Sequence, residues 1–194
     1  MPGRSGGSFV NRFAVGKSIL LPYLLVLIVA TLRLTVSHPY NFIPIFACLL
    51  FFGAVRPKRE FAMPFAVLVG VDIFLTTHSY GYALTWDQTL TWAWYLVAMF
   101  LGAAMLGSSI SAPRVIGASL GAAVSFFLAS NFAVWASWRM YPMTVSGLGS
   151  CYVAALPFVR NSVVTELTSS LLIFMVWKYR ESLFPARSMQ GACS

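Results

Sequence analysis

Six apolar runs divide the chain, and short polar or proline-containing breaks separate them. A membrane-spanning helix needs about 20 mostly apolar residues, with a range of roughly 17 to 25. Most of the runs fall close to this length. The pattern therefore predicts six transmembrane helices, over residues 19–36, 42–55, 61–77, 90–107, 115–138 and 156–177.

Two places in this pattern are irregular. The second run is short and carries Pro44 near its start, so we expect this helix to be tilted or to begin with irregular backbone buried in protein. The longest break, residues 139–155, contains Gly147 and Gly149 but is too apolar for a free linker. We expect it to form a loop that folds back over the helix ends.

Small residues are also placed regularly. Gly117 and Gly121 lie four residues apart, next to Ala118 and Ala122, and predict one helical face that permits close contact with another helix. Ordinary packing inside the bundle is the favoured interpretation of this face, and a docking surface for a partner is the alternative.

Composition supports a membrane protein. Of the 194 residues, 59% are hydrophobic and only 9% are charged, and the mean hydropathy is +0.78. Soluble domains carry about 25% charged residues. The length allows one domain, so we expect an all-α transmembrane domain over residues 18–178, between cytoplasmic tails of residues 1–17 and 179–194.

The basic residues give this bundle a direction. Ten of them fall on the side of the predicted membrane that also holds both termini, and only Arg33, Arg139 and Arg160 fall on the other. Cytoplasmic loops carry such an excess, so both termini are expected in the cytoplasm and the protein in the plasma (inner) membrane. The net charge of +8 is spread over short loops and tails, which does not indicate nucleic-acid binding.

A few costly polar side chains fall inside the apolar runs. Asp72 and Glu166 are acids, Arg33 is a base and Asn131 is an amide. An ionisable group at membrane depth costs several kcal/mol unless it is paired or hydrated, so it is treated as functional by default. On the predicted topology these groups lie in the outer half of the bilayer or near its midplane.

Helical spacing places such residues in stripes. The stripes are Asp72, Thr76 and Ser79; Asn131, Trp135 and Trp138; and Ser162, Glu166, Ser169 and Ser170. Stripes on several helices in the outer half predict a cavity open to the outside, where aromatic walls and a few polar groups suit a small ligand. The candidate substrate-binding residues are Arg33, His38, Asn41, Asp72, Asn131, Trp135 and Glu166.

Most of the candidates have an expected role. Arg33 would meet an anionic group, Asp72 and Glu166 would meet cationic or hydroxyl groups, Asn131 would form hydrogen bonds and Trp135 or Trp138 would stack on the ligand. A purely structural network, in which Arg33 pairs with one of the acids, is an equal alternative and is compatible with a pocket. A proton path is a third alternative, since a carboxylate buried this deeply can be protonated.

Other kinds of site have less support. A metal site built from His38, His78, Asp72 and Glu166 lacks close ligand spacing, and no cofactor motif is present. Three scattered cysteines form no disulfide framework and no CxxC pair. Because no credible pair of nucleophile and base is found, we do not expect an enzyme.

Several sequence strings resemble an uncharacterised family of small bacterial membrane proteins. They include Asn131-Phe132-x-x-Trp135 and Gly147-Leu148-x-x-Cys151-Tyr152, together with His38-Pro39-x-Asn41 in the first half. That family is similar in size and helix count to the substrate-binding S components of energy-coupling factor transporters. The resemblance implies a six-helix fold, a solute bound near the outer face, and as partners an energy-coupling membrane subunit and a pair of ATPases.

The expected function is therefore the capture of a small polar solute from outside the cell, as the binding component of an uptake system. The chain begins with Met1-Pro2 rather than Met-His, which argues against cobalt or nickel as the solute. The alternative is a membrane scaffold or interaction protein whose intramembrane polar residues only hold the helices together.

Overall fold

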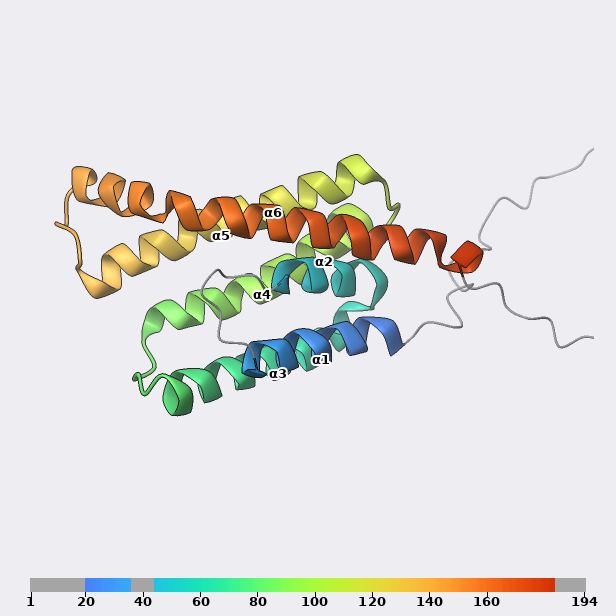
Figure 1. Ribbon diagram of the computed structural model, residues 1–194, viewed down its shortest axis with the longest axis horizontal. Helices are drawn as coiled ribbons and strands as arrows, with labels where there is room; N and C mark the ends of the chain where they lie inside the picture. Colours follow the sequence, from blue (N-terminus) through green and yellow to red (C-terminus); the bar gives the residue numbers. More distant parts are fainter. Residues whose placement is uncertain (1–19, 36–43, 184–194) are drawn as a thin grey trace, which may run out of the picture.

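The computed structural model describes residues 20–35 and 44–183, and these residues are helical with no β-strand (Figure 1). Their α-helices are α1 (Leu20–Thr35), α2 (Ile45–Val55), α3 (Ala62–Phe74), α4 (Trp86–Leu106), α5 (Ala112–Trp138) and α6 (Val145–Leu183). A short 3-10 turn, η1 (Lys58–Glu60), precedes α3, and a π-helical segment, η2 (Leu75–Ser79), continues it.

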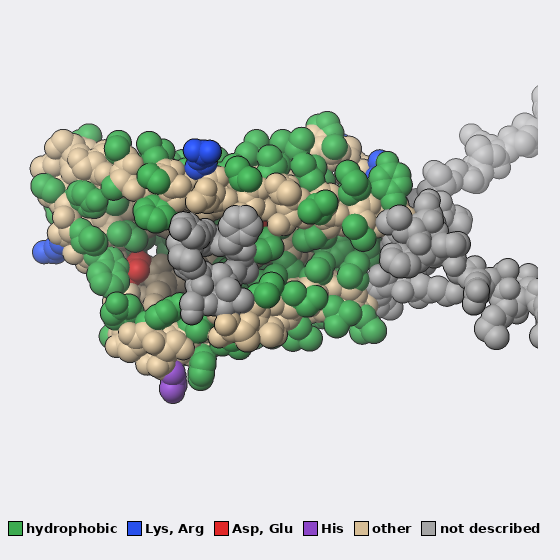
Figure 2. Space-filling view, viewed as in Figure 1, with side chains coloured by type: hydrophobic (Ala, Val, Ile, Leu, Met, Phe, Trp, Pro, Cys, Tyr) green, Lys and Arg blue, Asp and Glu red, His purple; other side chains and the backbone are tan. Residues whose placement is uncertain are grey.

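Four helical segments are long and apolar enough to cross a membrane. They are Lys58–Ser79, Trp86–Leu106, Ala112–Trp138 and Val145–Tyr179. The helices α1 and α2 are apolar but shorter. At 1.5 Å per residue, the 11 residues of α2 cover only about 16 Å, roughly half of the hydrocarbon core of a bilayer. Apolar side chains cover much of the surface in Figure 2, as expected of an all-helical membrane protein.

Consecutive helices run in opposite directions along the bundle (Figure 1). One end, here called the Trp86 end, holds the start of α4 and the connection between α5 and α6. The opposite end, here called the Arg56 end, holds the connection from α2 to α3 and the last turns of α6. The short helix α2 occupies the half of the bundle nearer the Arg56 end, so its first turn lies inside the bundle.

The core of the fold is α2. Eight consecutive residues, from Phe46 to Gly53, are buried, which is typical of a helix that is apolar on every side. The ring of Phe51 makes edge-on contacts with Phe174 and Trp177 of α6, at centroid distances of 5.4 and 5.2 Å. Packing on all faces explains why this short helix is apolar around its whole circumference.

A close helix contact joins α2 to α4 through two glycines. A Cβ atom at Gly53 would lie 2.0 Å from the carbonyl oxygen of Met99, and a Cβ at Gly102 would lie 2.1 Å from that of Leu50. The two backbones therefore touch where neither residue has a side chain. The predicted small face of α5 is different, because a Cβ at Gly117 or Gly121 would meet only side-chain atoms of α4, at 3.7 and 3.9 Å.

The predicted loop over residues 139–155 is wrong for most of its length, because α6 begins at Val145. One glycine in a helix costs only about 1 kcal/mol relative to alanine, and tertiary contacts can offset this. Here the Tyr152 hydroxyl donates to the Leu128 carbonyl at 2.7 Å and ties the new turns to α5. Gly147 is required by a close approach, since a Cβ there would lie 2.0 Å from the Pro142 carbonyl oxygen.

Candidate functional site

A cavity of about 560 Å³ lies inside the half of the bundle nearer the Trp86 end. Each of the six helices supplies part of its lining, and the first turn of α2 is one of its walls. Figure 2 shows a hollow near the Trp86 end of the face seen there. The cavity is therefore a feature of the whole bundle and not of one helix pair.

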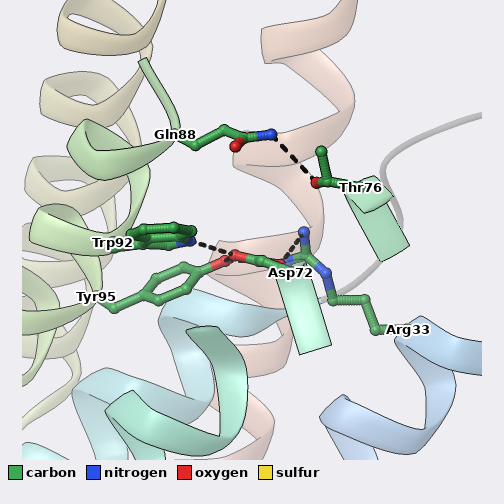
Figure 3. A network of polar contacts seen from close by, with 6 residues as sticks. All are labelled: Arg33, Asp72, Thr76, Gln88, Trp92 and Tyr95. Carbon is green, nitrogen blue, oxygen red and sulfur yellow. Dashed lines mark hydrogen bonds and ion pairs between the residues drawn. The ribbon is translucent and has the colours of Figure 1, made fainter. Parts of the chain in front are cut away.

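A charged network forms one side of this cavity (Figure 3). Arg33 of α1 pairs with Asp72 of α3, with 2.7 Å between Nη2 and Oδ1. The other carboxylate oxygen, Oδ2, accepts hydrogen bonds from the Tyr95 hydroxyl at 2.8 Å and from the Trp92 indole at 3.2 Å. Arg33 Nη1 also donates to the Tyr95 hydroxyl, at 3.1 Å. The network joins α1, α3 and α4 at one point.

Burial makes this network energetically important. The side chain of Asp72 is only 10% exposed and that of Arg33 is 26% exposed. A buried ion pair is tolerated when further hydrogen bonds satisfy the remaining atoms, and removal of one partner leaves a costly unpaired charge. Tyr95 and Trp92 supply those further hydrogen bonds to Asp72.

The π-helical segment η2 follows Asp72 directly and shapes the cavity wall. Its wider turn is seen in the hydrogen bond from the Tyr80 N–H to the Leu75 carbonyl, at 2.9 Å. Thr76 in this segment accepts a hydrogen bond from the Gln88 side-chain amide of α4, at 3.1 Å. Single π turns inside helices occur frequently at functional sites. Here the turn brings Thr76 against α4, one turn of helix from Asp72.

Glu166 of α6 caps the buried start of α2. Its two carboxylate oxygens accept hydrogen bonds from the backbone N–H groups of Phe46 and Ala47, at 3.3 and 2.7 Å. The residue before the helix is Pro44, whose side chain supplies no cap. The first N–H groups of a helix need an acceptor, and the helix dipole favours a negative charge there. A residue 120 positions away in the sequence thus does the work of an N-cap.

This arrangement predicts that Glu166→Ala lowers the free energy of unfolding by about 1–3 kcal/mol, because buried N–H groups lose their acceptors. Glu166→Gln should lose less, since the amide oxygen can still accept. Thermal unfolding in detergent, followed by circular dichroism, measures both. Ser162→Ala is the matched control, because Ser162 lines the same cavity but its hydroxyl only donates to its own helix at Phe158. Equal melting temperatures for all four proteins would contradict the capping role.

Aromatic side chains make up much of the remaining wall. Phe46, Phe126 and Phe127 line the cavity together with the rings of Trp92 and Tyr95. Phe46 and Phe126 contact each other, with ring centroids 4.8 Å apart. Apolar and aromatic walls with a few convergent polar groups are typical of sites for small molecules.

Residues 13–187 match a protein family described as a family of unknown function, DUF6580. The chain belongs to this family. No curated protein and no solved structure matches it. The functional argument for this DUF6580 member therefore depends on its own residues.

The DUF6580 fold brings together four of the residues selected from sequence. Arg33, Asp72, Asn131 and Glu166 all line the cavity, although they come from α1, α3, α5 and α6. Asn131 donates its amide to the Phe127 carbonyl of its own helix at 2.8 Å. His38 and Asn41, also selected from sequence, lie outside the described residues.

Five residues expected on the polar stripes do not line the cavity, namely Ser79, Trp135, Trp138, Ser169 and Ser170. Trp135 donates its indole N–H to the Pro142 carbonyl at 3.0 Å, so the ring is held by the connection between α5 and α6. Ser79 was expected on the same face as Asp72, but the π turn between them rotates it, and it is exposed. The spacing rule fails there because it assumes 3.6 residues per turn throughout.

Sequence reasoning missed the contribution of α4. This helix presents Gln88, Thr91, Trp92 and Tyr95 to the cavity, at positions i, i+3, i+4 and i+7. That spacing is itself a helical stripe and could have been detected. Two of its members are aromatic, so their hydrogen-bonding groups were not counted among the costly polar residues.

A metal centre has no support within residues 20–35 and 44–183. No group of three His, Cys, Asp or Glu side chains gathers there. His78, one of the ligands considered, is exposed and stacks on Phe74 with ring centroids 5.0 Å apart. The metal site that was considered from the sequence also included His38, which lies outside these residues.

Proposed function

We propose that this DUF6580 protein binds a small polar solute in the cavity of its helix bundle. The observation that carries the proposal is a cavity of about 560 Å³, lined by all six helices, with polar groups at membrane depth. A filled core would need no such space, and intramembrane ionisable residues commonly mark solute or ion pathways. A volume of this size fits within the range of small-molecule sites.

The direction of capture follows from the distribution of basic residues along the chain. Arg56, Lys58 and Arg59 lie at the Arg56 end, and most of the other basic residues belong to that side in the proposed topology. The excess of positive charge on cytoplasmic loops makes this end the cytoplasmic one, with both termini inside and six membrane crossings. The cavity would then receive solute from the outer face of the plasma membrane.

This orientation is testable with single cysteines in a cysteine-free background. Met143 is exposed at the Trp86 end, and Arg59 is exposed at the Arg56 end. A membrane-impermeant maleimide should label Met143→Cys on intact cells. It should label Arg59→Cys only after the cells are permeabilised. The reverse pattern would overturn the proposed orientation.

The role in uptake rests on the resemblance to S components of energy-coupling factor transporters. The proposed partners are an energy-coupling membrane subunit and ATPases, which would supply the movement that a binding bundle cannot drive alone. The bundle by itself would account for recognition of the solute.

Binding itself can be tested with a cavity-filling variant. Ser130→Trp places a large ring in the lining, and Leu128→Trp places the same ring on the exposed side of α5. In native mass spectrometry of the purified protein, we expect a bound small molecule in the wild type and in Leu128→Trp. It should be absent from Ser130→Trp. A molecule retained equally by all three proteins would place it outside the cavity.

A scaffold function is the second candidate, and the same network favours it. Asp72 is satisfied by Arg33, Tyr95 and Trp92, and Glu166 is satisfied by the start of α2. In a scaffold these contacts would serve only to hold the helices together. The cavity-filling variant Ser130→Trp distinguishes a scaffold from a solute-binding protein. A scaffold would lose neither a ligand nor an interaction when the cavity is filled.

A further inference from the structure

The acidic and basic side chains that line the cavity do not balance. Of its lining residues, only Arg33, Asp72 and Glu166 belong to the types Arg, Lys, Asp and Glu. Arg33 and Asp72 pair with each other across 2.7 Å. Within the described residues, Glu166 forms no ion pair, and it is only 6% exposed. The described lining therefore holds one carboxyl group without a basic partner, that of Glu166.

The N-terminus of α2 does not use all of the hydrogen-bonding capacity of the Glu166 carboxylate. A carboxylate offers about four acceptor positions. The hydrogen bonds from Phe46 and Ala47 occupy one position on each oxygen, and the backbone N–H of Ile45 also faces the carboxylate. The end of a helix also supplies only about half of a positive charge. A ligand with a full positive charge would therefore gain more from Glu166 than a neutral one.

Several polar groups of the lining can accept further hydrogen bonds. The Gln88 side-chain oxygen is buried and has no hydrogen-bond partner. Asn131 and Ser162 each donate to a carbonyl of their own helix, and their side-chain oxygens can accept. These oxygens can receive hydrogen bonds from a ligand that donates them.

The walls suit the body of such a ligand. Trp92, Phe126 and Phe127 line the space, and aromatic faces attract cations as well as apolar groups. We propose that the cavity selects a small organic monocation, a protonated amine on an apolar or aromatic body, with Glu166 as its counter-charge. This inference rests on the proposed function and names its substrate class.

Three probes of nearly equal size test the proposal. Phenethylamine is a cation at neutral pH, 2-phenylethanol is neutral and phenylacetate is an anion. Equilibrium dialysis measures the binding of each probe. A control with detergent alone corrects for partition of the probe into micelles. For the wild-type protein we expect phenethylamine to bind at least about 10-fold more tightly than 2-phenylethanol, with phenylacetate the weakest, because only the cation gains from the buried carboxylate. This order needs no variant.

Two variants locate the selectivity. Glu166→Gln should bring the affinities of phenethylamine and 2-phenylethanol within about 3-fold of each other, because the charge has been removed while the shape is kept. Trp135→Phe is the control and should keep the full preference, since Trp135 does not line the cavity. A wild type that prefers the neutral or anionic probe overturns this inference and leaves solute binding intact. A wild type that binds none of the three overturns it together with the proposed function.

Discussion

Replacement of Gly102 by alanine is expected to destabilise the protein by about 3 kcal/mol or more, because the added methyl group has no room. Its Cβ would lie 2.1 Å from the Leu50 carbonyl oxygen of α2. The obstacle is backbone in the middle of a buried helix, so no side chain can rotate away. Gly53→Ala should behave in the same way, since its Cβ would lie 2.0 Å from the Met99 carbonyl oxygen. Thermal unfolding in detergent measures both.

The control is Gly70→Ala, which makes the same chemical change in α3. Nothing lies within 4 Å of a Cβ atom there. Alanine is the better helix former by about 1 kcal/mol, so this variant should be as stable as the wild type or slightly more stable. If Gly102→Ala has the same melting temperature as Gly70→Ala, α2 and α4 are not in backbone contact.

Removal of the carboxylate at Asp72 is the second large effect. Asp72→Leu leaves the Arg33 charge half-buried and deprives Tyr95 and Trp92 of their acceptor. Loss of one partner of a buried pair costs about 3–5 kcal/mol. Arg33→Leu should cost less, because Tyr95 and Trp92 still donate hydrogen bonds to the Asp72 carboxylate that it leaves behind. The measurement is again the free energy of unfolding in detergent.

The double variant Arg33→Leu/Asp72→Leu shows what the pair itself contributes. An apolar replacement of both partners is often close to neutral, so this protein should recover most of the loss seen in Asp72→Leu. Additive losses in the double variant would contradict a direct pair. If the double variant is stable but binds no solute, the pair serves recognition, whereas a scaffold would be unaffected.

Sequence patterning predicted the helices well where length alone decides the structure. The runs that became α3, α4 and α5 are long, apolar and flanked by charged or turn residues, and a chain in an apolar solvent has to form helices. It failed at the start of α6, where a loop was expected over residues 139–155, which include Gly149 and Gly147. That glycine is needed for contact with the Pro142 carbonyl, which only the folded chain reveals.

The candidate site shows the same division. Arg33, Asp72 and Glu166 could be selected from sequence because ionisable groups at membrane depth must face the interior of a bundle. The sequence left open which acid pairs with Arg33, and it did not predict the partner of Glu166. The Arg33–Asp72 pair joins two helices. The contact of Glu166 with the start of α2 is possible because α2 begins inside the protein. Spacing along one helix identifies which residues share a face, but not which residues of other helices contact that face.

The backbone contact between α2 and α4 has a mechanical consequence. Two helices that touch at Gly53 and Gly102 cannot slide past each other without a collision of main-chain atoms, so they form one stiff unit. In Figure 1, α1 and α3 lie together on the side of this unit that is opposite to α5 and α6. Asp72 and Thr76 join them to α4 through side-chain hydrogen bonds at the cavity. The cavity thus has one rigid wall, and any change in its width has to come from the other helices that line it.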